Sequence, residues 1–242
     1  MATQDSAYGT VVTIRNVGHL GTAHFLDVPG KPGEVEKENV TRLEFFVNDK
    51  PVTEFSPMMK LTGDAFRMER RSKIRGLDLD TTVSLRDGVL IETARIRVQE
   101  AMDLQSAYPW MYAWTSQATH YVFGDDNGSR QRGTFAKNTK YRAEVVKNAN
   151  WMAVFNAATG KGSVCCFLKH PSDADGWFLL VDAPEAYRKV TAYTLENKIV
   201  PKGFDGTWQS AVGFFTATEA DWESHAARRA TELRSTPQKS DP

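Results

Sequence analysis

The chain has 242 residues, of which 41% are hydrophobic and 25% are charged, a composition typical of a soluble globular protein. Its 30 basic residues are balanced by 30 acidic ones, so the excess positive charge of a nucleic-acid-binding protein is missing and no nucleic-acid partner is expected. No apolar run is long enough to cross a bilayer, so no membrane partner is expected either. Large β domains often exceed this length, and we expect a single domain over residues 1–235.

The two cysteines, Cys165 and Cys166, are adjacent in the sequence. Neighbouring residues on a strand point to opposite faces, so no disulfide framework is expected. The chain starts with MATQDSAYG, which lacks the basic and apolar regions of a signal peptide. That start would also fit a mature secreted chain restarted with a methionine. The location therefore stays open: periplasmic or extracellular if a leader was replaced, and otherwise cytoplasmic.

The first part of the chain predicts two strands on either side of a long loop. Residues 11–15 and 44–52 are rich in β-branched and aromatic residues. The loop between them carries His19 and His24, followed by a group of glutamates that starts at Glu34. Loops of this length are usually functional or disordered. The histidine spacing matches no common metal site, so we expect no metal or other cofactor, and a metal site in this loop is the weaker hypothesis.

Residues 64–100 predict an antiparallel meander. Apolar and polar residues alternate in three successive segments, and the sequence Arg86-Asp87-Gly88-Val89 is a hairpin signal. Basic side chains crowd the first segment, namely Arg67, Arg70, Arg71, Lys73 and Arg75. They indicate either an edge strand protected by its charge or a basic cleft for an acidic sugar, in which Arg71 would bind the substrate.

Residues 108–123, YPWMYAWTSQATHYVF, are rich in aromatic side chains. We expect them to form one strand of the meander, with Trp110, Tyr112, Trp114 and His120 at the same parity. Aromatic side chains with polar tips suit a sugar-binding wall, and they suit the core of a sandwich equally well. Both interpretations stay open.

The remaining sequence predicts further strands and one helix. Residues 151–156 and 163–168 read as a hairpin, whose Gly160-Lys161 pair lacks the spacing of a phosphate-binding loop. Over residues 218–234, Thr218 is a good N-cap, and an amphipathic helix is predicted by apolar residues at helical spacing: Trp222, Ala226, Ala230 and Leu233. The polar tail 236–242 is expected to be disordered.

The order of these features resembles the galactose mutarotase-like β-supersandwich proteins, a superfamily that includes aldose epimerases and the central domains of several polysaccharide lyases. The resemblance is carried by FRMERRSKIRGLDLDTTVSLRDGVLIETARIRVQE leading into YPWMYAWTSQATHYVF, and GWFLLVDAPEAYRKVTAY adds to it. It implies an all-β fold, an antiparallel β-sandwich of the supersandwich type with a C-terminal α-helix. Such proteins bind sugars on a concave face and act with histidines and a carboxylate. His24 and His120 look like counterparts of those histidines, whereas no residue matches the catalytic glutamate of the epimerases.

We therefore expect a carbohydrate ligand. The leading hypothesis is a sugar epimerase or polysaccharide lyase, in which His24, His120 and Tyr112 perform acid–base catalysis in an aromatic-lined cleft. The expected substrate-binding residues are Trp110, Trp114, Arg71 and His19. The alternatives are a non-catalytic carbohydrate-binding module and a structural or assembly domain, and the sequence is compatible with a homo-oligomer.

Overall fold

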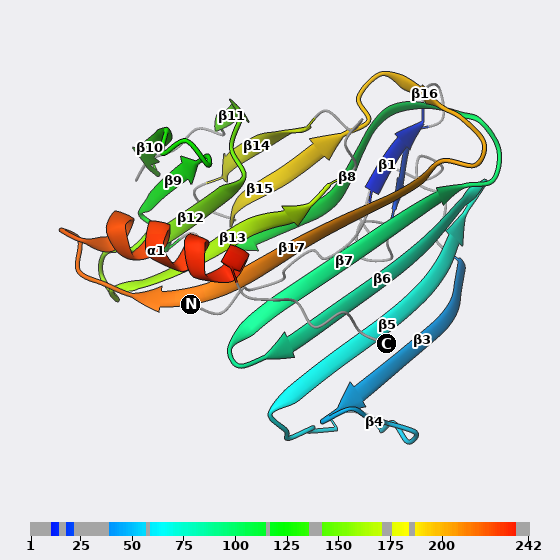
Figure 1. The fold of residues 1–242 in the computed structure, drawn as a ribbon, viewed down its shortest axis with the longest axis horizontal. Helices are drawn as coiled ribbons and strands as arrows, with labels where there is room; N and C mark the ends of the chain where they lie inside the picture. The colour runs from blue at the N-terminus through cyan, green and yellow to red at the C-terminus, as the bar shows by residue number, and fades with distance from the viewer. Residues whose placement is uncertain are drawn as a thin grey trace.

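The computed structural model describes residues 11–14, 18–21, 39–56, 59–114, 117–135, 142–170, 176–183 and 187–235. Within them the chain forms two antiparallel β-sheets and one helix (Figure 1). The smaller sheet has the order β11 (Arg142–Lys147), β14 (Gly176–Ala183), β15 (Tyr187–Thr194), β8 (Met102–Trp114), β1 (Val11–Ile14) and β2 (Gly18–Gly21), and β16 (Lys198–Val200) also pairs with β8.

The larger sheet contains the central hairpins of the chain. Its order is β10 (Arg130–Thr134), β9 (His120–Gly124), β12 (Trp151–Asn156), β13 (Lys161–Lys169), β17 (Asp205–Thr216), β7 (Val89–Val98), β6 (Leu77–Arg86), β5 (Ala65–Ile74), β3 (Asn39–Val47) and β4 (Lys50–Pro51). The predicted all-β antiparallel sandwich with a C-terminal helix is confirmed. The β5–β6–β7 meander is confirmed as well, and its β6–β7 turn places Asp87 and Gly88 at positive φ.

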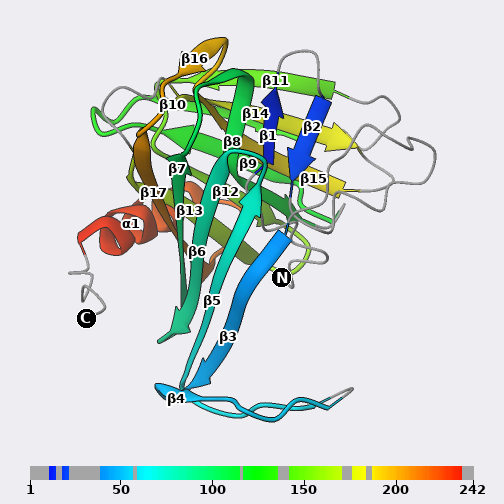
Figure 2. The same ribbon diagram turned by 90° about the vertical axis from the view of Figure 1, so that its right-hand side faces the viewer.

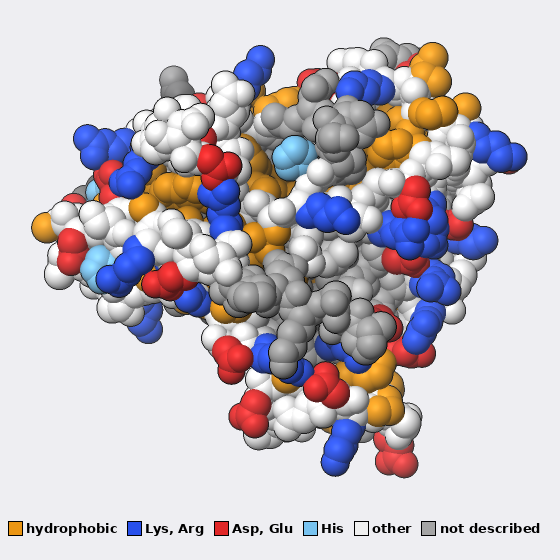
Figure 3. Space-filling view, viewed as in Figure 1, with side chains coloured by type: hydrophobic (Ala, Val, Ile, Leu, Met, Phe, Trp, Pro, Cys, Tyr) orange, Lys and Arg blue, Asp and Glu red, His pale blue; other side chains and the backbone are white. Residues whose placement is uncertain are grey.

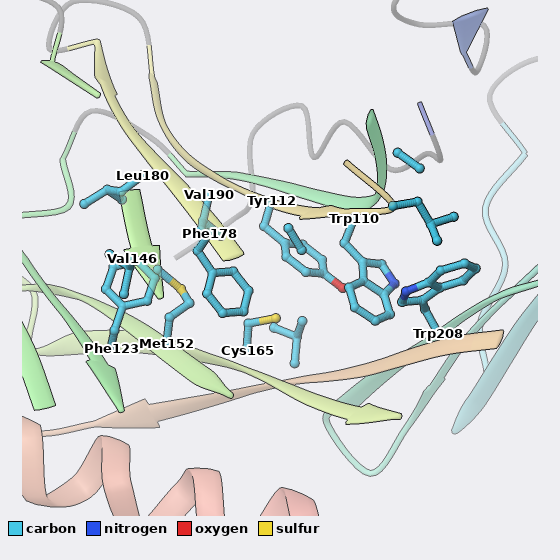
Figure 4. Close-up of a cluster of buried hydrophobic side chains, with 14 of the residues drawn as sticks. Trp110, Tyr112, Phe123, Val146, Met152, Cys165, Phe178, Leu180, Val190 and Trp208 are labelled. Carbon is cyan, nitrogen blue, oxygen red and sulfur yellow. The ribbon is translucent and has the colours of Figure 1, made fainter. Parts of the chain in front are cut away.

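The main core lies between the two sheets. Side chains from both sheets interdigitate there, among them Trp110 of β8, Phe178 of β14 and Met152 of β12 (Figure 4). Alternation along β13 sends Cys165 into this core and Cys166 to the opposite face of the larger sheet, and both thiols are free. The sequence prediction for the cysteine pair is confirmed.

A second core lies on the outer face of the larger sheet, beneath the helix α1 (Trp222–Ser235). The four apolar residues that predicted the helix are its buried ones. Trp222 stacks on Phe155 of β12, with ring centroids 5.4 Å apart. At the N-terminus, the Asp221 carboxylate accepts hydrogen bonds from the backbone nitrogen of Thr218 (2.8 Å) and from its hydroxyl (2.7 Å). The strands β12 and β13 are consequently covered on both faces.

The far side of the larger sheet extends beyond the smaller one. This extension consists of β3, β4, β5 without its last residue Ile74, and the distal half of β6, and it projects away from the sandwich in both views (Figures 1 and 2). Its inner face is apolar and partly uncovered, as the exposures of Val40 (43%), Leu43 (49%) and Leu85 (38%) show. Its outer face is charged.

The predicted basic segment is an inner strand of the larger sheet, so its assignment to an edge strand is wrong. β5 pairs with β3 on one side and β6 on the other. Two of its cations face carboxylates of the neighbouring strand β6: Arg71 lies 2.9 Å from Asp80, and Lys73 lies 3.7 Å from Asp78. Figure 3 shows basic and acidic side chains interspersed along this part of the surface.

The expectation of one strand over residues 108–123 is also wrong. β8 ends at Trp114 in the smaller sheet, and β9 begins at His120 in the larger sheet. The chain crosses between the sheets in the intervening residues. Thr119 secures the crossing, because its backbone nitrogen donates to the Phe155 carbonyl (2.7 Å) and its hydroxyl accepts from the Ala157 nitrogen (2.9 Å). Tyr112 and His120 therefore belong to different sheets, and the predicted shared face of one strand does not exist.

Replacing Trp222 with alanine should lower the free energy of unfolding by about 3–5 kcal/mol, because the variant loses the ring stacked on Phe155 and leaves a cavity under α1. Urea denaturation of the full chain measures the loss. Arg228→Ala on the exposed side of the same helix is the control and should change stability by less than about 0.5 kcal/mol. Equal effects of the two substitutions would contradict the packing described for α1.

Candidate functional site

An aromatic cavity of about 220 Å³ lies between the two sheets. Both sheets and the β11–β12 connection contribute to its wall. Its aromatic lining consists of Trp110, Phe167, Trp177, Phe178, Tyr193 and Trp208, and its polar lining of Asn148, Asn150, His170 and Thr194. Cavities of this kind, apolar with a few polar groups, are the usual form of a small-ligand site.

Two of the aromatic lining residues, Trp177 and Tyr193, are neighbours through the pairing of their strands. Trp177 of β14 and Tyr193 of β15 are paired residues, so their side chains leave the same face of the smaller sheet, the face opposite to that of Phe178 and Ala192 in the main core. The two rings are parallel within 2° and their centroids lie 4.2 Å apart. The Trp177 indole nitrogen donates to Glu196 Oε2 at 3.0 Å. The stacking and the hydrogen bond together fix the orientation of the Trp177 ring.

The opposite end of the cavity lies in the main core. There Trp110 packs against Phe167 at 4.8 Å, and Phe167 packs against Phe178 at 4.5 Å. Polar atoms of three lining residues are buried without a hydrogen-bond partner: the indole nitrogens of Trp110 and Trp208, and the Thr194 hydroxyl. This end therefore combines an apolar surface with polar groups that remain unpaired.

The cavity wall carries no aspartate, glutamate, lysine or arginine among the residues that the structure describes. Burying an ion without an opposite charge is strongly unfavourable. The wall is accordingly suited to an uncharged ligand that offers apolar surface and several hydrogen-bonding groups.

Two of the predicted site residues lie in the main core. Trp110 lines the cavity. Tyr112 is 2% exposed, and its hydroxyl lies 2.6 Å from Ser210 Oγ and donates to Glu92 Oε2 at 3.1 Å. Burial raises the pKa of Glu92 to about 8, against the smaller lowering effects of the Tyr112 hydrogen bond and the charge of Arg70. Tyr112 thus belongs to a buried polar cluster and is not among the residues that line the cavity.

His120 lies on the outer face of the larger sheet, near the start of α1. Its Nδ1 is 2.8 Å from the Thr119 hydroxyl, its Nε2 is 3.6 Å from Glu219, and its ring centroid is 5.7 Å from that of Trp222. Trp222 and Phe155, its aromatic neighbours, belong to the second core. The structure therefore does not bring His120 together with Trp110 or Tyr112.

The other predicted residues are spread further. Arg71 lies on the extension, paired with Asp80. His19 is in β2 and Trp114 ends β8, where it is in register with Arg188 of β15, but both side chains fall outside the described part. His24 and the proposed metal loop at Glu34 also fall outside it. The roles predicted for these residues stay predictions.

Sequence reasoning missed a second polar cluster between the sheets. Tyr121 of β9 donates to Glu144 of β11 at 2.9 Å, across from one sheet to the other. Nearby, the buried Arg188 of β15 pairs with Asp182 of β14 at 3.1 Å, and its guanidinium lies 5.1 Å from the centre of the Phe135 ring. Phe135 in turn packs on Tyr121. The sequence does contain one indication of this cluster. Arg188 lies two and four residues before the apolar Val190 and Ala192, so on a strand all three side chains point to the same buried face.

The described residues include no group of three or more histidine, cysteine, aspartate or glutamate side chains placed to hold a metal ion. The described helix is not long and apolar enough to span a bilayer.

No protein-family model and no curated protein matches the chain, whereas several solved structures are similar to it. The α-galactosidase AgaA of glycoside hydrolase family 36 from Geobacillus stearothermophilus, solved with stachyose, is 13% identical over 86% of this chain and 30% of its own, with a TM-score of 0.49. The chain thus spans less than a third of that enzyme.

Two other solved structures match most of both chains. The Slr1438 protein from Synechocystis is 9% identical over 74% of this chain and 75% of its own, with a TM-score of 0.46. A candidate aldose 1-epimerase from Escherichia coli is 10% identical over 77% of this chain and 71% of its own, with a TM-score of 0.45. At these identities and TM-scores the comparisons assign no function to the chain.

Glu92 should make stability depend on pH. Its pKa is about 8 in the folded chain and near 4.5 when unfolded, so the folded state holds the proton more tightly. Its contribution to the free energy of unfolding is complete below pH 4.5 and is lost as the pH rises toward 8, by an amount on the order of a few kcal/mol.

The variant Glu92→Gln keeps the shape of the side chain without the charge. Subtracting its stability curve from that of the unchanged chain should leave a decline between pH 4.5 and 8, and the variant should be the more stable of the two above pH 8. Chemical denaturation at a series of pH values measures both curves. Parallel curves would show that Glu92 is not protonated in the folded core.

Proposed function

We propose that the protein binds an uncharged carbohydrate in the aromatic cavity. The observation that carries this proposal is the composition of the wall, in which six aromatic rings are combined with amide, hydroxyl and imidazole groups and with no charged aliphatic side chain. A sugar ring presents apolar C–H faces and an equatorial belt of hydroxyl groups. Aromatic rings take up the faces, while Asn148, Asn150 and His170 offer partners for hydroxyl groups.

The cavity favours binding over catalysis. Acid–base chemistry requires a proton donor and acceptor within hydrogen-bond reach of the substrate, and His170 and Tyr193 are the only titratable side chains among the described lining residues. A lyase acting on an acidic sugar would need a cation to hold the carboxylate, and the described wall has no lysine or arginine. The carbohydrate-binding module is therefore the better supported of the functions predicted from the sequence.

Trp177→Ala should weaken sugar binding by about 30-fold or more, because truncating a fixed aromatic anchor commonly costs at least about 2 kcal/mol. Titration calorimetry against a panel of neutral mono- and oligosaccharides measures the change. Phe55→Ala on the extension is the matched control, since Phe55 is an exposed aromatic residue (61%) that does not line the cavity. Unchanged binding by Trp177→Ala, or equal losses in both variants, would remove the cavity from consideration.

A second candidate function, a sugar epimerase, is supported by the cluster around Tyr121. The Tyr121–Glu144 and Arg188–Asp182 pairs supply a phenol, two carboxylates and a guanidinium within one aromatic surrounding, which are suitable groups for moving protons on a sugar. Tyr121 also packs on Phe123, which packs on Phe178 in the cavity wall. The predicted catalytic residues His24 and His120 would have to act from elsewhere, and their roles remain proposals.

If this cluster is catalytic, Glu144→Gln should abolish turnover with folding and sugar binding intact, because the amide keeps a hydrogen bond to Tyr121 and cannot take up a proton. Anomer exchange of aldoses, followed by magnetization-exchange NMR, measures turnover. Glu219→Gln next to His120 is the control. Exchange that persists in Glu144→Gln and stops in Glu219→Gln would transfer the catalytic role to His120.

A further inference from the structure

The inner end of the cavity holds two hydrogen-bond donors that face each other. Trp110 comes from β8 of the smaller sheet and Trp208 from β17 of the larger one, and each is 2% exposed. Figure 4 shows their indole nitrogens pointing toward one another. Neither nitrogen has a hydrogen-bond partner. Both residues line the same cavity, together with Thr194, whose hydroxyl is buried and unpartnered as well.

Buried polar side chains are nearly always hydrogen-bonded, so two unpaired donors directed at one place call for an acceptor. An indole N–H can only donate. The group that meets both must therefore be an oxygen with two free lone pairs. A carbonyl oxygen has two lone pairs and no proton of its own, whereas a hydroxyl group brings a proton that needs a further acceptor.

A carboxylate, the other group that only accepts hydrogen bonds, is excluded by its charge. A carboxylate would bury a full negative charge, and the described lining residues include no lysine or arginine to compensate it. The surroundings are also apolar, since the Phe167 ring packs 4.8 Å from Trp110. The best match is thus a neutral carbonyl that carries a small apolar substituent.

We infer that the cavity recognises the acetamido group of an N-acetylated sugar. The carbonyl oxygen accepts from the Trp110 and Trp208 indoles, the methyl group packs against Phe167, and the amide N–H donates to the Thr194 hydroxyl. The three unpartnered polar atoms of the cavity are thereby matched by one acceptor and one donor on the ligand. This inference rests on the proposed function, because it names the class of carbohydrate that the same cavity binds.

Binding requires a small movement. Neither indole nitrogen is exposed to solvent, so the rings of Trp110 and Trp208 have to part for an oxygen to enter between them. Ligand binding should consequently change the environment of both indoles, and their fluorescence should respond to acetamido sugars.

The test compares two pairs of sugars that differ only at the second carbon: N-acetylglucosamine with glucose, and N-acetylgalactosamine with galactose. Calorimetric titration of the full chain should show tighter binding of the acetamido member of at least one pair. Trp208→Phe keeps an aromatic ring and removes the N–H, so it should lower the affinity for that acetamido sugar by about 3-fold to 10-fold more than it lowers the affinity for the parent hexose.

Two further variants make the result independent of folding effects. Trp222→Phe is the same substitution at a similarly buried position (4% exposed) on the opposite face of the larger sheet, and it should change neither affinity. Thr194→Val removes only a hydroxyl, and it should reproduce the selective loss if Trp208→Phe does not fold.

The outcomes separate this inference from the proposed function. Sugars that bind with no preference for the acetamido member, or equal losses for both members of a pair in Trp208→Phe and Thr194→Val, would overturn the inference and leave carbohydrate binding in place. No binding of any of the four sugars or their oligomers would overturn the proposed function itself. A selective loss in either cavity variant supports the acetamido site.

Discussion

The central strands of the larger sheet are apolar on both faces, and the rest of the structure depends on this constraint. The six side chains of β12 are all buried, as are residues Gly162 to Cys166 of β13. A strand of this kind is stable in water only if both of its faces are covered. The smaller sheet covers the inner face and α1 covers the outer face, so the sandwich and its helix follow from one requirement.

The cavity lies where the smaller sheet covers the larger one with its largest side chains. At the end of the sandwich formed by β8, β14 and β17, the two sheets meet through tryptophan and phenylalanine rings. Rigid rings pack with less adaptability than aliphatic side chains, and space for a ligand remains between them. Farther out, the larger sheet continues as the extension without a facing partner sheet, and there its charged outer side and apolar inner side are distinct.

Local patterns predicted the elements of this fold well. The Asp87-Gly88 turn, the β12–β13 hairpin and the apolar residues of α1, such as Ala226 and Leu233, are decided by residues close in sequence. The crossing between Trp114 and His120 was missed because it depends on hydrogen bonds from Thr119 to residues 36 and 38 positions away, which no local pattern contains.

The site was predicted only in part for the same reason. Trp110 was recognised as a candidate from the aromatic run, but Phe167, Phe178 and Trp208 are brought to it by sheet pairing and by stacking of the two sheets. His120 was predicted to be catalytic because histidine commonly transfers protons. In the structure its ring packs beside Trp222 of α1, away from the cavity. Chemistry that depends on convergence of distant strands becomes visible only once the register is known.

The most direct test of the account is an NMR titration of the tryptophan indole N–H signals with N-acetylated and unmodified sugars. Six tryptophans are distributed over the chain, so they report on separate regions. Sugar should shift the signals of Trp110, Trp177 and Trp208 and leave unchanged those of Trp151, which lies beneath α1, and Trp222, which is part of α1. Shifts confined to Trp222 beside His120, or no shift with any sugar, would contradict a binding site in the aromatic cavity.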